Sequence, residues 1–548
     1  MSRRFAMETE QNSPTKRPTR WWPAVVILIS FFLALIVIRS TGDDNQQFQV
    51  LWTLSAILIS TILLVSWALF LSRLAKRIRL VILGGLVGAG VLFGTCFRFS
   101  QFSGNMVPLF EWRWAKRTLP TTEGQPIEPS AEPSLDPLAR LSFPQFLGPS
   151  RDCHVPGPEL ADDWDAEPPK SLWRQPIGAA WSGFAIAGHR AVTQEQRDEL
   201  EAVACYDIRT GTLLWLHTYP GRYKTAIAGE GPRATPTIHD GRVYALGATG
   251  TLNCLDLPTG KPVWQRIIPA DAGLKLDAPV DQSGLSGNRN KSKEWGYASS
   301  PLIVNGRVVV SAGGEDGRSL LAYDTTTGEP AWTGGDSRAG YSSARLAKLH
   351  GESQILIFNQ NGLAAHAPGD GSVQWEFEWD VGYPHVSMPV TLPGNRILVS
   401  LGYGQGSKLL QVDADDGRFS ASELWKSIRM KAKFTNLVFH NGHFFGLDDG
   451  MFACIDAERG RRKWKDGRYG HGQILLRGGH ILVMAENGDV VLLEANPERH
   501  VELTRFAALD GKTWNPPALA NDYLLVRNHR EAACYRLPSA KPAESAAQ

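Results

Sequence analysis

Seven side chains of this 548-residue chain are candidates for a ligand mouth, because aromatic rings beside a few converging polar groups are typical of binding pockets. They stand next to short apolar runs: Glu195, Arg233, Trp295, Tyr297, Asn515, Arg527 and His529. If those runs are strands around a channel, these residues would lie near its rim. The same residue types also fill a channel and satisfy its backbone, so the pattern leaves both a binding and a structural interpretation open.

The cysteines point away from redox or metal chemistry. No two of the six are adjacent, and the haem-attachment motif Cys-x-x-Cys-His is absent. Cys205, Cys254, Cys454 and Cys534 recur at one position of a repeat, where a buried Cys acts as a small hydrophobe. Cys153-His154 resembles half of a metal site without recognisable partners. We therefore expect no metal site, no catalytic residues and no bound cofactor.

The elements that must position the candidates form a repeat. A small residue, then x-Asp-x-x-Thr-Gly-x-x-x-Trp, ends at Trp215, Trp264 and Trp332, and shorter versions end at Trp375, Trp425 and Trp464. The copy before Trp425 is assigned Asp413 and an insertion of four residues. Two degenerate copies bring the count to eight. A period of about 40–50 residues indicates an array of supersecondary units.

Each unit contains four predicted strands. In the unit from 234 to 266, Asp240-Gly241 between two apolar runs is a hairpin signal. Four antiparallel strands repeated radially predict an all-β, eight-bladed β-propeller. The last unit stops after its third strand, and Leu172-Trp173-Arg174 at the front is expected to supply the fourth and close the ring.

The repeat resembles that of the pyrroloquinoline-quinone (PQQ)-type propellers, which include quinoprotein alcohol dehydrogenases and the outer-membrane assembly lipoprotein BamB. The resemblance covers about residues 143–538. Its opening, Phe143-Pro144-Gln145-Phe146-x-Gly148-Pro149-x-Arg151-Asp152, is similar to that of membrane-anchored PQQ-binding-like propellers of planctomycete-type bacteria. The resemblance implies that one tryptophan per blade docks against the neighbouring blade: Trp173, Trp215, Trp264, Trp332, Trp375, Trp425 and Trp464. It also implies PQQ and calcium as the alternative to our expectation of no cofactor.

Three long apolar runs lie within residues 21–97, and each is about as long as a membrane-spanning helix. The basic residues before the first run and between the second and third (Arg73, Lys76, Arg77 and Arg79) place those segments in the cytoplasm. The predicted domains are a cytoplasmic tail (1–20), three transmembrane helices (21–97), a juxtamembrane segment with a Pro-rich linker (98–142), the propeller (143–538) and a disordered tail (539–548).

These observations predict a multi-pass protein of the bacterial inner membrane with a periplasmic propeller. A formal net charge of +2 argues against a nucleic-acid partner. The favoured hypothesis is a binding or scaffold module for an envelope protein or complex, and this interpretation favours a protein that is not an enzyme. The alternatives are a quinoprotein-like dehydrogenase using PQQ and a sensor that binds a small ligand in the channel mouth.

Overall fold

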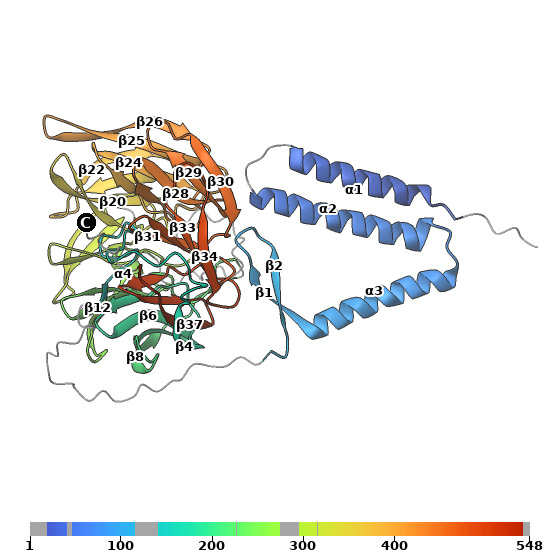
Figure 1. The fold of residues 1–548 in the computed structure, drawn as a ribbon, viewed down its shortest axis with the longest axis horizontal. Coiled ribbons are helices and arrows are strands. Elements are labelled where there is room, and N and C mark those ends of the chain that lie inside the picture. Colours follow the sequence, from blue (N-terminus) through green and yellow to red (C-terminus); the bar gives the residue numbers. More distant parts are fainter. Residues whose placement is uncertain are drawn as a thin grey trace, which may run out of the picture. The chain divides into compact units, whose positions relative to one another are not determined.

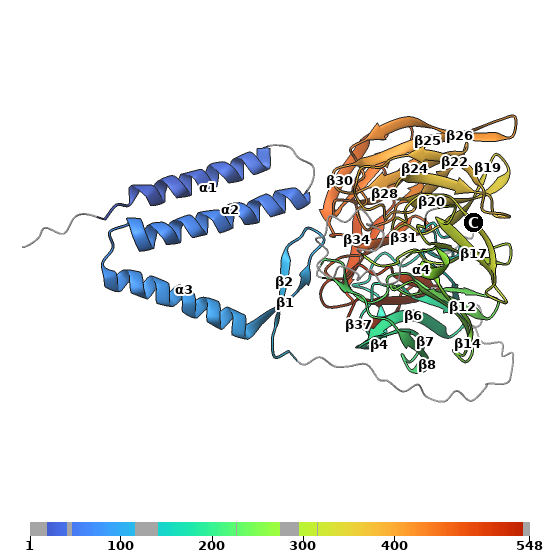
Figure 2. The same ribbon diagram turned by 180° about the vertical axis from the view of Figure 1, so that it is seen from behind.

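The computed structural model describes residues 19–40, 46–115, 141–225, 227–274, 295–314 and 316–540. The chain divides into two compact units, Met1–Lys116 and Arg117–Gln548. Figures 1 and 2 show the elements of each unit from opposite sides. Most of the predicted Pro-rich linker, the loop at 275–294 and residues 541–548 lie outside the described residues.

The first unit holds three helices that are long and apolar enough to cross a membrane. They are α1 (Trp22–Ser40), α2 (Gln46–Ser66), which a π-helical turn η1 (Trp67–Leu71) extends, and α3 (Lys76–Cys96). The juxtamembrane segment is structured: β1 (Phe97–Phe102) and β2 (Pro108–Trp112) form an antiparallel hairpin directly after α3. The sequence interpretation assigned no strands there.

The second unit is an eight-bladed β-propeller, as predicted, and each blade is an antiparallel sheet. Blades 1 to 4 are β5 (Ala185–Ala187), β6 (Arg190–Arg197), β7 (Leu200–Asp207) and β8 (Leu213–Pro220); β11 (Thr237–His239), β12 (Arg242–Leu246), β13 (Thr251–Asp256) and β14 (Pro262–Ile267); β15 (Leu302–Val304), β16 (Arg307–Ser311), β17 (Leu320–Asp324) and β18 (Pro330–Gly334); and β19 (Arg345–Leu349), β20 (Glu352–Asn359), β21 (Gly362–His366) and β22 (Val373–Glu378).

Blades 5 to 8 are β23 (Val390–Leu392), β24 (Arg396–Leu401), β25 (Gly406–Asp415) and β26 (Arg418–Ser427); β27 (Val438–His440), β28 (His443–Asp448), β29 (Met451–Asp456) and β30 (Arg462–Arg468); β31 (Gln473–Arg477), β32 (His480–Met484), β33 (Asp489–Glu494) and β34 (Glu502–Ala507); and β35 (Ala518–Ala520), β36 (Tyr523–Arg527), β37 (Glu531–Arg536) and β4 (Lys170–Pro176). The shorter elements β3 (Ser142–Phe143), β9 (Lys224–Thr225), β10 (Gly229–Glu230) and α4 (Ile268–Asp271) lie outside this repeat.

The pattern of apolar residues in a strand depends on the position of that strand in its blade. The second and third strands of a blade, such as β12 and β13, are buried almost throughout, because neighbouring blades cover both of their faces. The fourth strand, such as β14, alternates between exposed and half-buried residues. Continuous and alternating apolar runs in the sequence therefore mark inner and outer strands.

The ring closes as expected from the orphan front strand. β4 completes blade 8 by pairing with β37, and Trp173 lies opposite Cys534. This pairing covers the edge of β37, which would otherwise present unpaired backbone groups to solvent. The residues just after the last strand are also ordered: Ala540 N–H donates to the Glu159 carbonyl (2.8 Å), although the sequence assigned Ala540 to a disordered tail.

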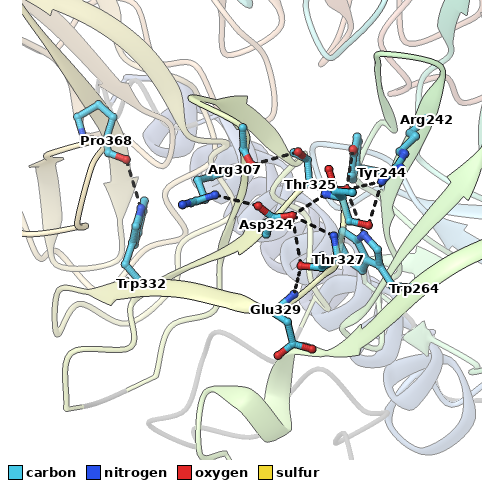
Figure 3. A network of polar contacts seen from close by, with 12 residues as sticks. Arg242, Tyr244, Trp264, Arg307, Asp324, Thr325, Thr327, Glu329, Trp332 and Pro368 are labelled. Carbon is cyan, nitrogen blue, oxygen red and sulfur yellow. Dashed lines mark hydrogen bonds and ion pairs between the residues drawn. The ribbon is translucent and has the colours of Figure 1, made fainter.

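A tryptophan joins most neighbouring blades. Its indole N–H donates to a backbone carbonyl in the turn between the third and fourth strands of the next blade (Figure 3). The pairs are Trp173–Ile208 (2.8 Å), Trp215–Leu257 (2.9 Å), Trp264–Thr325 (3.1 Å), Trp332–Pro368 (3.2 Å), Trp425–Ala457 (3.0 Å) and Trp464–Asn496 (3.0 Å).

In the turn that accepts the tryptophan, the aspartate fixes the backbone and the glycine leaves room for the indole ring. Asp324 accepts hydrogen bonds from the Thr326 and Thr327 backbone amides, which fixes the carbonyl that Trp264 reaches. Gly328 has φ +73°, and a Cβ there would lie 2.6 Å from the Trp264 ring. The Asp-x-x-Thr-Gly motif is therefore the socket for the preceding blade's tryptophan.

The residue opposite each docking tryptophan on the third strand is usually small. Cys254 pairs with Trp264, and Ala322 pairs with Trp332. Cys254 is fully buried, and burial raises the pKa of its thiol to about 11. The recurrent cysteines are thus small apolar residues beneath an indole ring.

Blade 5 departs from the sequence assignment. Gln411, and not Asp413, pairs with Arg396 at the position that aspartate holds elsewhere, because β25 and β26 continue into a long hairpin. The carbonyl that a tryptophan would reach, that of Val412, instead lies 2.8 Å from His350 Nε2. Trp375 donates within its own blade, to Gln354 Oε1 at 2.8 Å.

The socket predicts different effects for two matched glycines of blade 2. Gly260 (φ +69°) faces Trp215, with a built Cβ 2.5 Å from the ring, whereas Gly241 (φ +70°) has open space around it. Both Gly→Ala changes should cost about 1–2 kcal/mol of backbone strain. Gly260→Ala should lose about 1–3 kcal/mol more, because it overpacks the socket. Denaturant titration of both variants measures the difference, and equal losses would contradict the socket.

Candidate ligand site at the mouth of the channel

One end of the channel is filled by the segment 141–161, which precedes β4. We call this segment the plug. Phe143 in β3 pairs with Ile186 in blade 1, and the Pro144 carbonyl accepts the Ile238 amide of blade 2 (2.7 Å). Arg151 then donates to the backbone carbonyls of Ser300 and Pro301 at 3.0 and 2.8 Å, just before blade 3.

The plug continues to the far side of the ring. His154 Nε2 lies 3.2 Å from the Phe439 carbonyl of blade 6, and the Val155 amide donates to Leu476 of blade 7 (2.8 Å). Arg151 is 2% exposed, and burial lowers its pKa to about 9. The motif at residues 143–152, which opens the predicted propeller, therefore belongs to the plug and has a structural role. The sequence analysis did not place it in the channel.

The opposite end of the channel is lined by loops that precede the first strands. Five of their aromatic side chains form what we call the aromatic collar: Trp181, Trp295, Tyr341, Phe434 and Trp514. The ring centroids of Trp181 and Trp514 lie 5.1 Å apart, those of Trp514 and Phe434 4.9 Å, those of Phe434 and Trp295 5.9 Å, and those of Trp295 and Tyr341 4.9 Å. These residues precede blades 1, 3, 4, 6 and 8, so the contacts cross the channel axis.

Cations lie against the collar. Lys512 Nζ is 3.6 Å from the Trp514 ring centroid, and Lys433 Nζ is 5.3 Å from that of Phe434. Such cation–π contacts gain strength where water is excluded. Burial lowers the pKa of Lys512 to about 7 and that of Lys433 to about 8. Both amines can therefore change charge close to neutral pH.

Acidic groups moderate this positive charge. Glu486 accepts the His471 backbone amide (2.9 Å) and the Trp514 indole N–H (3.0 Å), which fixes it beneath the collar. Its charge opposes the loss of a proton from Lys512 and Lys433. Burial, reinforced by Lys433, lowers the pKa of His471 to about 3, so that ring is neutral.

Glu195 and Arg527 were two of the predicted rim residues. Both are buried, and their hydrogen bonds stabilise the region where the ring closes. Glu195 is fully buried and accepts hydrogen bonds from the Gly178 amide (2.9 Å), Arg197 Nε (2.7 Å) and the Tyr206 hydroxyl (2.5 Å). Arg527 is 1% exposed and donates from blade 8 to the Gln194 carbonyl of blade 1 (2.9 Å). Their polar atoms are therefore used within the fold.

The other five candidates are divided between structure and collar. Asn515 is buried and donates to the Ser182 carbonyl (2.8 Å), and the Tyr297 amide donates to Ala248 (2.9 Å). Trp295 belongs to the collar, and the His529 ring centroid lies 5.6 Å from that of Trp181. Arg233 stacks over Tyr223 at 4.1 Å.

Sequence reasoning missed Lys433, Lys512 and Glu486. Lysine and glutamate are normally solvated, so they attract no notice as single residues. The available signal was their position, since Lys433-Phe434 and Lys512-Thr513-Trp514 share the loops that supply the collar aromatics.

The collar fits the PQQ and calcium pair of quinoprotein relatives only in part. The aromatic rings of the collar could stack on a planar ligand, and Lys433 and Lys512 could pair with its negative charge. However, no group of three or more His, Cys, Asp or Glu side chains within the described ranges is placed to hold a metal ion, and the sequence has no adjacent cysteines. We derive no reaction step through a quinone.

Comparison with known proteins agrees with this architecture. The family model described as outer membrane protein assembly factor BamB matches residues 163–276, 201–466 and 363–539. The chain belongs to this family. BamB of Burkholderia pseudomallei (strain K96243) is 28% identical over 186 residues, 31% of this chain and 46% of that protein.

Dehydrogenases share parts of the same fold. The dehydrogenase subunit of the quinone-dependent alcohol dehydrogenase of Komagataeibacter europaeus is 31% identical over 134 residues, 23% of this chain and 16% of that protein. The chain thus spans less than half the length of these curated relatives. The solved europium-containing methanol dehydrogenase matches 73% of this chain and 98% of its own, with a TM-score of 0.52 and 12% identity, which shows the fold alone.

The buried Lys512 predicts a pH-dependent stability. Its pKa of about 7 lies below the value near 10.4 of an unfolded lysine, so between these values the unfolded chain binds more protons. Stability of the native protein should therefore rise with pH there, relative to Lys512→Met, by up to about 1.4 kcal/mol per pH unit. Denaturation midpoints of both proteins at pH 6 to 9 measure this. Lys348→Met, at an exposed lysine, controls for the loss of a charge. A pH-independent difference for Lys512→Met would contradict the assignment.

Proposed function

We propose that this protein is a membrane-anchored propeller that binds an envelope protein or complex on the outside of its disc, as a scaffold or assembly module. The observation that carries the proposal is that the chain's own residues make contacts across both ends of the channel, the plug at one end and the collar at the other. A partner must then bind the outer surface. Membership of the BamB family supports the same role.

The proposed location is the bacterial inner membrane, with the propeller in the periplasm. Three apolar helices support the anchoring. Arg73 lies in the turn between η1 and α3, and Lys76, Arg77 and Arg79 lie at the start of α3. Such basic segments beside membrane-spanning helices stay in the cytoplasm. A helix that starts there ends on the other side, so the chain after Cys96 emerges in the periplasm.

This topology can be tested with reporter fusions. Alkaline phosphatase folds to its active form only after export, because its disulfides need an oxidising compartment. A fusion after Gln548 should be active, and a fusion after Arg77 should be inactive although expressed at a similar level. The reverse pattern of activities would contradict the proposed sidedness.

We propose the β25–β26 hairpin as a partner contact. It replaces the socket turn of blade 5 with two strands that continue to a tight turn at Asp416-Gly417. Asp413 and Asp415 near its tip are exposed, and Leu424 on the outer strand is 50% exposed. An exposed outer strand with both apolar and charged side chains can bind another protein along its edge.

Crosslinking in living cells tests this proposal on the full-length protein. Replacing 413–420 by a short Asp-Gly turn should abolish the main crosslinked protein band, because the contact surface is lost. A mouth variant with Arg233→Ala and Trp295→Ala should leave the band unchanged. Loss of the band only in the mouth variant would instead place the protein contact at the collar and contradict binding on the outside of the disc.

The dehydrogenase alternative has its own test. Purified protein supplied with PQQ and calcium should not reduce an artificial dye with alcohols or sugars. The described residues hold no cluster of three or more His, Cys, Asp or Glu side chains that could hold a metal ion, and the sequence has no adjacent cysteines to cap a quinone. An established quinoprotein assayed in parallel confirms that the assay works. Robust quinone-dependent turnover would overturn the scaffold proposal.

A further inference from the structure

The hairpin that follows α3 has one aromatic face. Its register pairs Phe97 with Trp112 and Phe99 with Phe110. Side chains alternate between the two sides of a strand, so these four rings lie on one side, which we call the aromatic face. The ring centroids lie 5.3 Å apart in the first pair and 6.2 Å apart in the second. Phe99, Phe110 and Trp112 are 43%, 47% and 47% exposed.

The opposite side of the hairpin carries polar side chains beside Leu109. Arg98 and Glu111 face each other across the strands and form an ion pair of 3.3 Å. Ser100, at the bulge, also bonds the Glu111 carboxylate. A two-stranded sheet that has aromatic rings on one side and a neutralised ion pair on the other is amphipathic, and it presents its apolar side to something outside the first unit's own core.

The aromatic face continues directly from the apolar surface of α3. No loop separates the two, since α3 ends at Cys96 and β1 begins at Phe97. Phe93 of the last helical turn lies 5.1 Å from Phe97 and 5.0 Å from Phe110, measured between ring centroids. No residue of α3 is buried by the rest of the chain. Whatever solvates the end of α3 therefore also reaches the aromatic face.

The hairpin is also fixed to the helix end. The Arg113 amide donates to the Cys96 carbonyl (2.7 Å), and Arg113 Nη2 donates to the Gly94 carbonyl (2.8 Å). These bonds satisfy carbonyls that the end of a helix leaves unpaired. They hold the hairpin at the level where the helix ends.

The opposite ends of the apolar helices also carry aromatic side chains. Trp21 and Trp22 at the start of α1 are 67% and 62% exposed, and the indole of Trp67, the first residue of η1, donates to the Arg20 carbonyl (2.8 Å). Tryptophan and other amphipathic aromatic rings collect where a bilayer meets water. Aromatic groups thus flank the three apolar helices at both ends.

We propose that the aromatic face of the β1–β2 hairpin lies in the lipid headgroup region of the bilayer and anchors the exit of α3 there. The occupant of this face is phospholipid, because the face is continuous with the surface of α3 that crosses the membrane. Arg98–Glu111 then faces the aqueous side. This inference rests on the three helices crossing a membrane and does not depend on which partner the propeller binds.

The test is photo-crosslinking of the full-length protein in its native membrane. p-Benzoylphenylalanine would replace Phe110 or Phe99 on the aromatic face. The matched control is Leu109, the apolar neighbour of Phe110 whose side chain alternates to the other side. Mass spectrometry of the hairpin peptide after irradiation identifies phospholipid adducts.

Phospholipid adducts should be at least about fivefold more abundant at Phe110 and Phe99 than at Leu109, because only the first two contact the interface. Two results would overturn the proposal. One is equal lipid adducts on both sides of the hairpin. The other is that the aromatic positions crosslink to propeller peptides, a second copy or another protein. Phenylalanine analogues at two separate positions limit the effect of any local misfolding.

Discussion

The hydrogen bond from a tryptophan indole to the next blade's turn is the interaction on which the propeller depends. In its complete form it combines an aspartate that fixes the turn, a glycine that leaves room for the ring, and a small residue beneath it, as with Asp324, Gly328 and Cys254 around Trp264. The same contact joins the two ends of the ring, because Trp173 of β4 in blade 8 donates to the turn of blade 1.

The way the propeller ring closes limits which of its surfaces can bind a partner. The front of the chain must pass beneath the disc to deliver β4, and the plug uses that passage to fill one end of the channel. At the other end, Trp295 reaches Phe434 three blades away, and lysines pack against the rings. Polar groups such as Arg527 and Glu195 are used to join blade 8 to blade 1. The outer surface is the part of the disc where we propose that a partner binds.

The fold could be predicted from the sequence because each blade repeats the same local solution: the Asp, Gly and Trp positions are set by one contact. At one place where that contact is absent the residue assignment was wrong: in blade 5, Gln411 and not Asp413 holds the position. The roles of Glu195 and Arg527 depend on partners more than 300 residues away or across a strand pair, and the plug and the β1–β2 hairpin occur once. A repeat pattern in the sequence cannot predict contacts that occur once and join distant residues.

The central claim is that the channel is filled by the protein itself and that binding takes place outside it. Native mass spectrometry of the full-length protein, extracted from its own membrane with mild detergent, tests this most directly. We expect the mass of the chain alone and of the chain with a protein partner, without a stoichiometric small molecule or metal ion. A retained quinone, calcium or other small ligand at one equivalent per chain would contradict the claim.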